Sequence, residues 1–277
     1  YNRTKTQNHE EFYETMELMT NSSNNTVYAD SDGNISYYHG NFVPRRDPSF
    51  DWNKPLEGRN PATQWQGLHP VDELITVFNP PNGWIQNTNN TPFNAAGEFS
   101  PKPNDYPKYM ANNPENPRGI HAVRVLNGQT GFTIDSLIEA AYDPLLTAFE
   151  ELMPALIMTT SINDMTESAS ASAVETLEYI DLLRGWDYRY SIDSTETSLA
   201  IFWAQQLMND VRDQALAANI NIYEFMADNT TADQKLNALR VAAQILESDF
   251  GSWQVPWGEI NRYQRLNGDI VQDFDDD

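Results

Sequence analysis

The spacing of apolar residues differs between the first part of this 277-residue chain and the rest. The residues on both sides of Asp32-Gly33-Asn34 are rich in β-branched and aromatic types, which predicts a β-hairpin with strands near residues 27–30 and 35–38. Before this hairpin, Phe12, Met16 and Met19 have the spacing of one helix face. We expect these three side chains to pack in a core, because apolar residues at this spacing usually do so rather than line a ligand site.

From Arg118 onward the apolar period becomes helical. Pro117 stands where a first helical residue is expected, and Thr133, Ser194 and Thr231 stand where N-caps are expected. Further helices are expected at residues 145–157, 170–184, 196–218, 232–247 and 256–265. The predicted fold class is therefore α+β: residues 1–95 carry short strands, and residues 96–277 form a proline-rich loop followed by a mostly helical region.

The stretch from Asn79 to Pro92 follows neither period. It opens with Pro80-Pro81-Asn82-Gly83, a turn sequence, and continues with Trp84-Ile85, which predicts a short buried strand. On such a strand Asn87 and Asn89 would share one face. Their amide groups offer neutral donors of the kind that stabilises an oxyanion developing in acyl transfer. The alternative is a polar loop built from Asx turns.

One acid–base candidate stands out in the sequence, His69, which precedes Pro70 and lies near Asp72 and Glu73. The residue before a proline is extended, and no serine or cysteine lies beside this histidine as a nucleophile. We therefore expect His69, Asp72 and Glu73 to be turn and helix-start residues.

Composition narrows the function classes. The formal net charge of −23 would repel nucleic acid and anionic membranes, and we interpret it as an adaptation for solubility. The chain has no cysteine, which excludes disulfides, thiolate metal sites and cysteine nucleophiles. No apolar run approaches the ~20 residues of a membrane span, and we expect no signal peptide within these residues. Aromatic residues make up 12% of the chain, and we assign them to the core rather than to an acyl pocket.

Three motifs stand in an order that is similar to one known family. They are Tyr28-Ala29-Asp30-Ser31-Asp32-Gly33-Asn34-Ile35 with Gly40, Pro44 and Arg45 after it, the stretch Gly83–Pro92, and Asn116-Pro117-Arg118-Gly119. In this order they resemble the β-chain of the penicillin acylase family of N-terminal nucleophile hydrolases. The resemblance runs from near residue 11 to the end of the chain. It implies a four-layer αββα core, of which this chain would hold part of the sheet.

The resemblance also implies roles for individual residues. Asn89 aligns with the oxyanion-hole asparagine, and Arg118 aligns with the arginine that orients the catalytic α-amine; the alternative for Arg118 is a surface residue at a helix start. Asp105 is the nearest candidate for a calcium ligand, and its alternative is a solvated turn aspartate. The nucleophile of the family is an N-terminal serine exposed by self-cleavage. This chain begins with Tyr1, so we expect the serine to lie outside it and the chain alone to be inactive.

The function expected from the resemblance is cleavage of the amide bond of N-acylated small molecules such as β-lactam antibiotics. Two alternatives stay open: an acylase of acyl-homoserine lactones, and a non-catalytic binding protein that keeps the fold. We expect the chain to be an internal part of a β-chain from a longer precursor. Its partners would then be the α-chain and the rest of the β-chain of that zymogen, in the periplasm or outside the cell, without nucleic acid or a membrane span.

Overall fold

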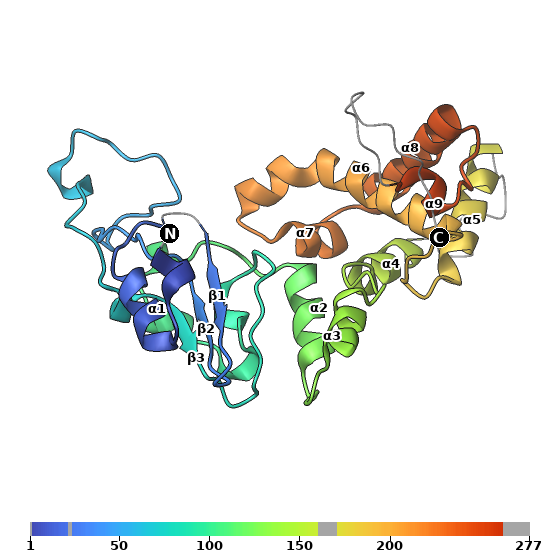
Figure 1. Ribbon diagram of the computed structural model, residues 1–277. Coiled ribbons are helices and arrows are strands. Elements are labelled where there is room, and N and C mark those ends of the chain that lie inside the picture. Colours follow the sequence, from blue (N-terminus) through green and yellow to red (C-terminus); the bar gives the residue numbers. More distant parts are fainter. Residues whose placement is uncertain (1, 22–23, 160–170, 263–277) are drawn as a thin grey trace, which may run out of the picture. The chain divides into compact units, whose positions relative to one another are not determined.

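The computed structural model of the protein describes residues 2–21, 24–159 and 171–262 (Figure 1). Contacts group the chain into two compact units, Tyr1–Asp143 and Pro144–Asp277, called here the first and the second unit. The strands of the described residues all lie in the first unit, whereas the second is built of helices, so the α+β prediction is confirmed. The boundary predicted between residues 95 and 96 separates a strand-containing part from a helical part. It is a different kind of boundary from the one between the two contact-based units, and it stays a prediction.

The elements follow one another in chain order. The strands are β1 (Thr26–Ala29), β2 (Ile35–Tyr38) and β3 (Thr76–Phe78). The α-helices are α1 (His9–Met16), α2 (Pro117–Leu126), α3 (Ile134–Ala141), α4 (Phe149–Ile157), α5 (Ala171–Arg184), α6 (Thr195–Ala218), α7 (Ile222–Asp228), α8 (Ala232–Phe250) and α9 (Trp257–Ile260). Short 3-10 helices are η1 (Asn2–Lys5), η2 (Pro61–Thr63), η3 (Val71–Glu73), η4 (Pro92–Asn94), η5 (Gly97–Phe99), η6 (Pro103–Asp105) and η7 (Lys108–Met110).

The predicted hairpin forms the centre of the first unit. β1 and β2 pair antiparallel, and β3, which the sequence pattern did not reveal, adds to the other edge of β2. Asp30 closes the hairpin turn, because its Oδ1 accepts hydrogen bonds from the backbone N–H groups of Asp32 and Asn34 at 3.0 and 2.9 Å. Gly33 takes a φ of +86°, which a residue with a Cβ adopts only with strain.

Neighbouring residues of β2 face opposite sides of the sheet, as strand geometry requires. Tyr38 packs with Phe12 and Met16 of α1, so this helix covers one face (Figure 1). Tyr37 packs with Val77 and with Ala95 and Ala96 of the loop that follows the sheet. The stretch from Asn79 to Pro92 and its continuation are thereby fixed on the other face. Burial raises the pKa of the Tyr37 hydroxyl, which stays protonated there.

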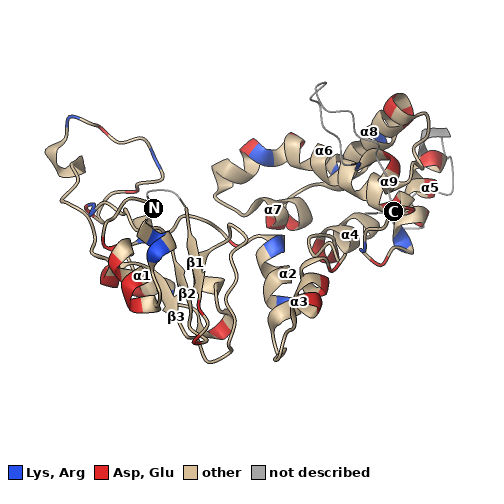
Figure 2. Cartoon of the chain, in the orientation of Figure 1, with Lys and Arg blue, Asp and Glu red and all other residues tan. Residues whose placement is uncertain are grey.

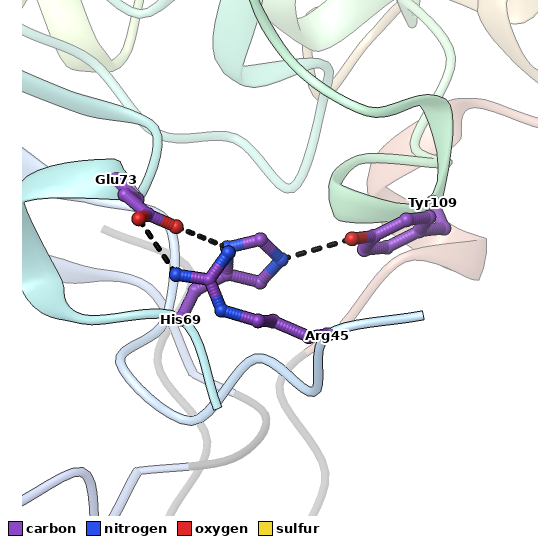
Figure 3. A network of polar contacts seen from close by, with 4 residues as sticks. All are labelled: Arg45, His69, Glu73 and Tyr109. Atoms are coloured by element: carbon purple, nitrogen blue, oxygen red, sulfur yellow. Dashed lines mark hydrogen bonds and ion pairs between the residues drawn. The ribbon is translucent and has the colours of Figure 1, made fainter. Parts of the chain in front are cut away.

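Residues 43–70 and 91–117 form two proline-rich loops, and Tyr109 joins the second of them to a network of four side chains (Figure 3). His69 is 4% exposed and lies between two partners: its Nδ1 is 2.7 Å from Glu73 Oε2, and its Nε2 is 2.9 Å from the Tyr109 hydroxyl in η7. Arg45 Nη2 donates to the other carboxylate oxygen of Glu73 at 2.6 Å. The hydrogen bond from His69 and then that from Arg45 lower the pKa of Glu73.

A large apolar core organises the second unit around α6. Leu199, Trp203, Leu207 and Val211 of this helix are fully buried, and they face α8 and the shorter helices around it. The Trp203 indole N–H donates to the Lys235 carbonyl of α8 at 3.0 Å, so the largest buried side chain also has its polar atom satisfied.

Helix starts in both units follow the predicted caps. Thr133, Ser194 and Thr231 are the N-caps of α3, α6 and α8, and Thr231 forms a reciprocal capping box with Gln234. The short helix α7 was not expected from the pattern, and the helix predicted over 256–265 is described only as α9, with residues 263–265 outside the described part.

In neither unit do the described residues include a helix that combines the length and the low polarity of a membrane span. Acidic residues recur on the helices of both units, in keeping with the net charge (Figure 2).

We predict that Trp203→Ala lowers the free energy of unfolding by about 3–5 kcal/mol, because it leaves a cavity between α6 and α8 and removes the hydrogen bond from the indole to the Lys235 carbonyl. Urea unfolding of the complete protein, followed by helical circular dichroism, measures the change. The matched control is Leu216→Ala on the same helix, whose side chain is 72% exposed and whose loss should stay within about 0.5 kcal/mol. Equal small effects of both would show that this packing does not stabilise the unit.

A second prediction concerns acid stability. Because the pKa of Glu73 is lower in the folded chain than its ordinary 4.5, its bonds to His69 and Arg45 contribute stability above that pH and lose it as the pH falls further. Glu73→Gln should therefore lower the melting temperature at pH 7 and flatten its decline below about 4.5. Glu98→Gln, an exposed carboxylate of the same unit, is the control. A parallel decline in wild type and Glu73→Gln would contradict the assignment.

Candidate functional site

The stretch from Asn79 to Pro92 forms a closed loop. The predicted turn is present: the Gly83 N–H donates to the Pro80 carbonyl at 2.9 Å, and Gly83 has a φ of +72°. Trp84 is buried, and its ring lies against Gly97, where a Cβ would stand only 3.2 Å from the ring. The Gln86 N–H donates to the Ala95 carbonyl at 2.8 Å and closes the loop.

The strand predicted at Trp84 and Ile85 is wrong, and both residues lie in irregular backbone. The physical reason is that the nearby amides bond to their own loop instead of leaving the backbone to a neighbouring strand. Asn89 has a left-handed φ of +59°, and its N–H donates to Asn87 Oδ1 at 3.3 Å. The Asx-turn alternative is the one that forms, and the argument that Asn87 and Asn89 share a strand face no longer holds.

Asn89 combines a fixed backbone with an exposed side chain. Besides the bond from its N–H, its carbonyl accepts a hydrogen bond from Asn113 Nδ2 at 3.2 Å. Its side-chain amide makes no hydrogen bond to any residue that the structure describes, and both amide N–H groups remain available for a ligand.

The next asparagine, Asn90, is 2% exposed and fully engaged. Its Oδ1 accepts from the Thr88 hydroxyl at 3.1 Å and from Gln86 Nε2 at 3.4 Å. Its Nδ2 donates to Glu115 Oε1 at 2.9 Å. Glu115 Oε1 also accepts from the Asn116 N–H at 2.9 Å, and Glu115 Oε2 accepts from Asn94 Nδ2 at 2.6 Å. We call Asn90, Asn94 and Glu115 the amide–carboxylate cluster.

The cluster joins the loop to the start of α2. Asn116 is the N-cap of this helix: its Oδ1 accepts from the Gly119 N–H at 2.9 Å, and its Nδ2 lies 3.4 Å from the Thr88 carbonyl. Pro117 occupies the first helical position as predicted. Arg118 follows in the first turn, is exposed, and has no hydrogen bond or ion pair to the described part of the chain.

The structure thus brings together the segments that carry Asn89 and Arg118, which lie 29 positions apart in the sequence. Both side chains are exposed, while the residues next to them are held by the cluster and the helix cap. Such an arrangement offers neutral amide donors and one guanidinium to an anionic or developing negative group. Sequence reasoning missed Glu115 and the burial of Asn90, because nothing in Asn113-Pro114-Glu115-Asn116-Pro117 separates a half-buried, hydrogen-bonded carboxylate from a solvated loop residue.

Asp105 lies elsewhere in the second proline-rich loop, at the end of η6, and is exposed. Calcium takes six to eight oxygen ligands. Among the described residues, no group of three or more acidic or histidine side chains is placed to hold a metal. The calcium role of Asp105 stays a prediction.

His69, the acid–base candidate of the sequence, has both ring nitrogens occupied by Glu73 and Tyr109 (Figure 3). Asp72 and Glu73 lie in the three-residue 3-10 helix η3, which forms a short turn and not the start of a longer helix. The pairing with Tyr109 across 40 positions could not be read from the sequence.

Comparison with known proteins places this geometry in context. The penicillin amidase family profile matches residues 1–272. The curated penicillin G acylase of Escherichia coli is 40% identical to the chain over 68 residues, which cover 24% of this chain and 8% of that protein.

Among solved structures, the chain is similar to a thermostable penicillin G acylase from Alcaligenes faecalis, with a TM-score of 0.59 and 18% identity. That match covers 90% of this chain and 51% of the other, so the chain spans about half the length of this structure. At this identity the likeness concerns the fold. The profile, however, covers nearly the whole chain, and the chain therefore belongs to the penicillin amidase family.

Proposed function

We propose that this chain is part of an acylase that hydrolyses the amide bond of N-acylated small molecules, including β-lactam antibiotics. Membership of the penicillin amidase family supports an amide hydrolase, and both similar proteins are named penicillin G acylase. In this proposal the acyl group is transferred to an N-terminal serine that this chain does not carry. The chain acts with the α-chain and the rest of the β-chain of its precursor, in the periplasm or outside the cell, and is inactive alone.

The observation that carries the proposal is that the backbone of Asn89 is hydrogen-bonded while its side chain is exposed. Its N–H and carbonyl are held by Asn87 and Asn113, whereas its side-chain amide is exposed. A donor that stabilises an oxyanion must be in place before charge develops, so that no reorganisation is needed in the transition state. We assign this role to the Asn89 amide. The exposed Arg118 guanidinium, with its rigid fork of donors, orients the α-amine of the serine in the same proposal.

We expect Asn89→Ala to lower kcat by about two to three powers of ten, which is ~2.7–4 kcal/mol, with a much smaller change in KM. KM changes less than kcat because the amide stabilises the transition state more than the ground state. The measurement uses the complete processed enzyme, with its N-terminal serine verified by mass spectrometry, and phenylacetyl amides and acyl-homoserine lactones as substrates.

The matched control is Asn112→Ala, an exposed asparagine of the same unit, which should keep a normal kcat. A normal kcat in processed Asn89→Ala would refute the oxyanion role. If Asn87→Ala alone loses kcat, the donor is Asn87 and the alignment is displaced by two residues.

A calcium role for Asp105 belongs to the same proposal and has its own test. If Asp105 ligates calcium together with oxygen atoms outside the described residues, calcium raises the melting temperature of the complete enzyme, by ligand linkage. Asp105→Ala should abolish that increase, and Glu98→Gln should keep it. An unchanged response to calcium in Asp105→Ala would identify Asp105 as a solvated turn residue.

A further inference from the structure

We infer that Glu115 is a positioning residue for the proposed acylase site, acting through the amide–carboxylate cluster on Asn89 and Arg118. The inference rests on the proposed function and adds to it a residue that contacts neither substrate nor nucleophile. Four observations carry it: the donors around Glu115, the burial of Asn90, the fit of Gly119, and the places where the cluster meets the chain.

The donors around Glu115 require a hydrogen-bond acceptor at this position. Asn90 Nδ2, Asn94 Nδ2 and the Asn116 N–H all point at the carboxylate, at 2.9, 2.6 and 2.9 Å. An ionised carboxylate only accepts hydrogen bonds, and its two oxygens match three donors. A glutamine at this position would present an NH2 group to one of them. Two donors would then face each other beside the buried Asn90, which is unfavourable.

Burial makes these bonds structural rather than incidental. Asn90 is 2% exposed, so bulk water cannot take the place of Glu115 as the acceptor for its amide N–H group. Gly119 of α2 is packed so closely on this pair that a Cβ there would overlap Asn90 Nδ2 and Glu115 Oε1. The first turn of α2 therefore lies directly against the cluster, and a shift of one moves the other.

Residues of the cluster are close in sequence to both proposed site residues. Asn90 immediately follows Asn89, and Glu115 and Asn116 precede Arg118 by three and two positions. Asn113 and Asn116 also reach across to the Asn89 and Thr88 carbonyls, at 3.2 and 3.4 Å. Because the Asn89 and Arg118 side chains are exposed, their directions depend on these neighbours. A displacement of about 1 Å in a catalytic group can lower a rate by a factor on the order of 100.

The experiment is a donor–acceptor exchange in the complete processed enzyme. Glu115→Gln should lower kcat about 10- to 100-fold with little change in KM. The double variant Glu115→Gln/Asn94→Asp places a carboxylate opposite the new NH2 group and keeps the amide oxygen of the introduced glutamine for Asn90 and Asn116. It should recover most of the lost kcat. A residue needed only for stability would not give this split between kcat and KM.

Two controls separate positioning from general loss of stability. Glu73→Gln breaks another carboxylate with two partners in the same unit, and it should lower the melting temperature but leave kcat near normal. If Glu115→Gln does not fold or mature, Asn94→Ala replaces it, because this variant removes one donor and keeps the bonds of the carboxylate to Asn90 and Asn116. Its kcat should fall as well, and a normal kcat in mature Asn94→Ala would overturn the inference.

The outcomes distinguish the inference from the proposed function. A normal kcat in Glu115→Gln, or no recovery in the double variant, overturns the role of Glu115 even when Asn89→Ala is inactive as proposed. A normal kcat in Asn89→Ala overturns both, since the cluster then has no catalytic donor to position. A low kcat in Glu115→Gln that the exchange with Asn94→Asp restores, together with an inactive Asn89→Ala, supports the inference.

Discussion

A buried side-chain amide needs hydrogen-bond partners, and in the first unit this requirement determines how two distant loops meet. Asn90 is almost fully buried and finds its acceptor in Glu115, 25 positions further along the chain. The apolar clusters of this unit are small, one between α1 and the sheet and one between the sheet and the following loop. Polar bonds with strict geometry therefore fix the loops, and the position of α2 depends on them.

The second unit is stabilised differently. Its helices bury a continuous apolar core around α6, and the caps at Ser194 and Thr231 set where α6 and α8 begin. Hydrophobic burial is non-directional, so such a core tolerates changes of side chain that a hydrogen-bonded cluster does not. The two units thus differ in the kind of interaction that substitutions will disturb.

The proposed site belongs to the polar unit, and this is physically sensible. Electrostatic stabilisation of a transition state requires donors whose direction is set beforehand. The backbone of Asn89 is held by Asn87 and Asn113, which fixes the point from which its exposed amide extends. The negative charge of Glu115 is engaged by three donors, which lets a carboxylate lie near a site that would stabilise another anion.

The sequence by itself determined the elements whose signals are local: the hairpin around Gly33, the caps at Thr133, Ser194 and Thr231, and the family, through three motifs in order. It misassigned Trp84 and Ile85 as a strand, because a short apolar pair does not reveal whether its neighbours bond to their own loop or to another strand. Only the tertiary structure decided that Asn90 is buried while Asn89 is exposed, that Glu115 accepts from both segments, and that His69 meets Tyr109. These facts rest on contacts between residues 25 to 40 positions apart, and a local pattern carries no record of such partners.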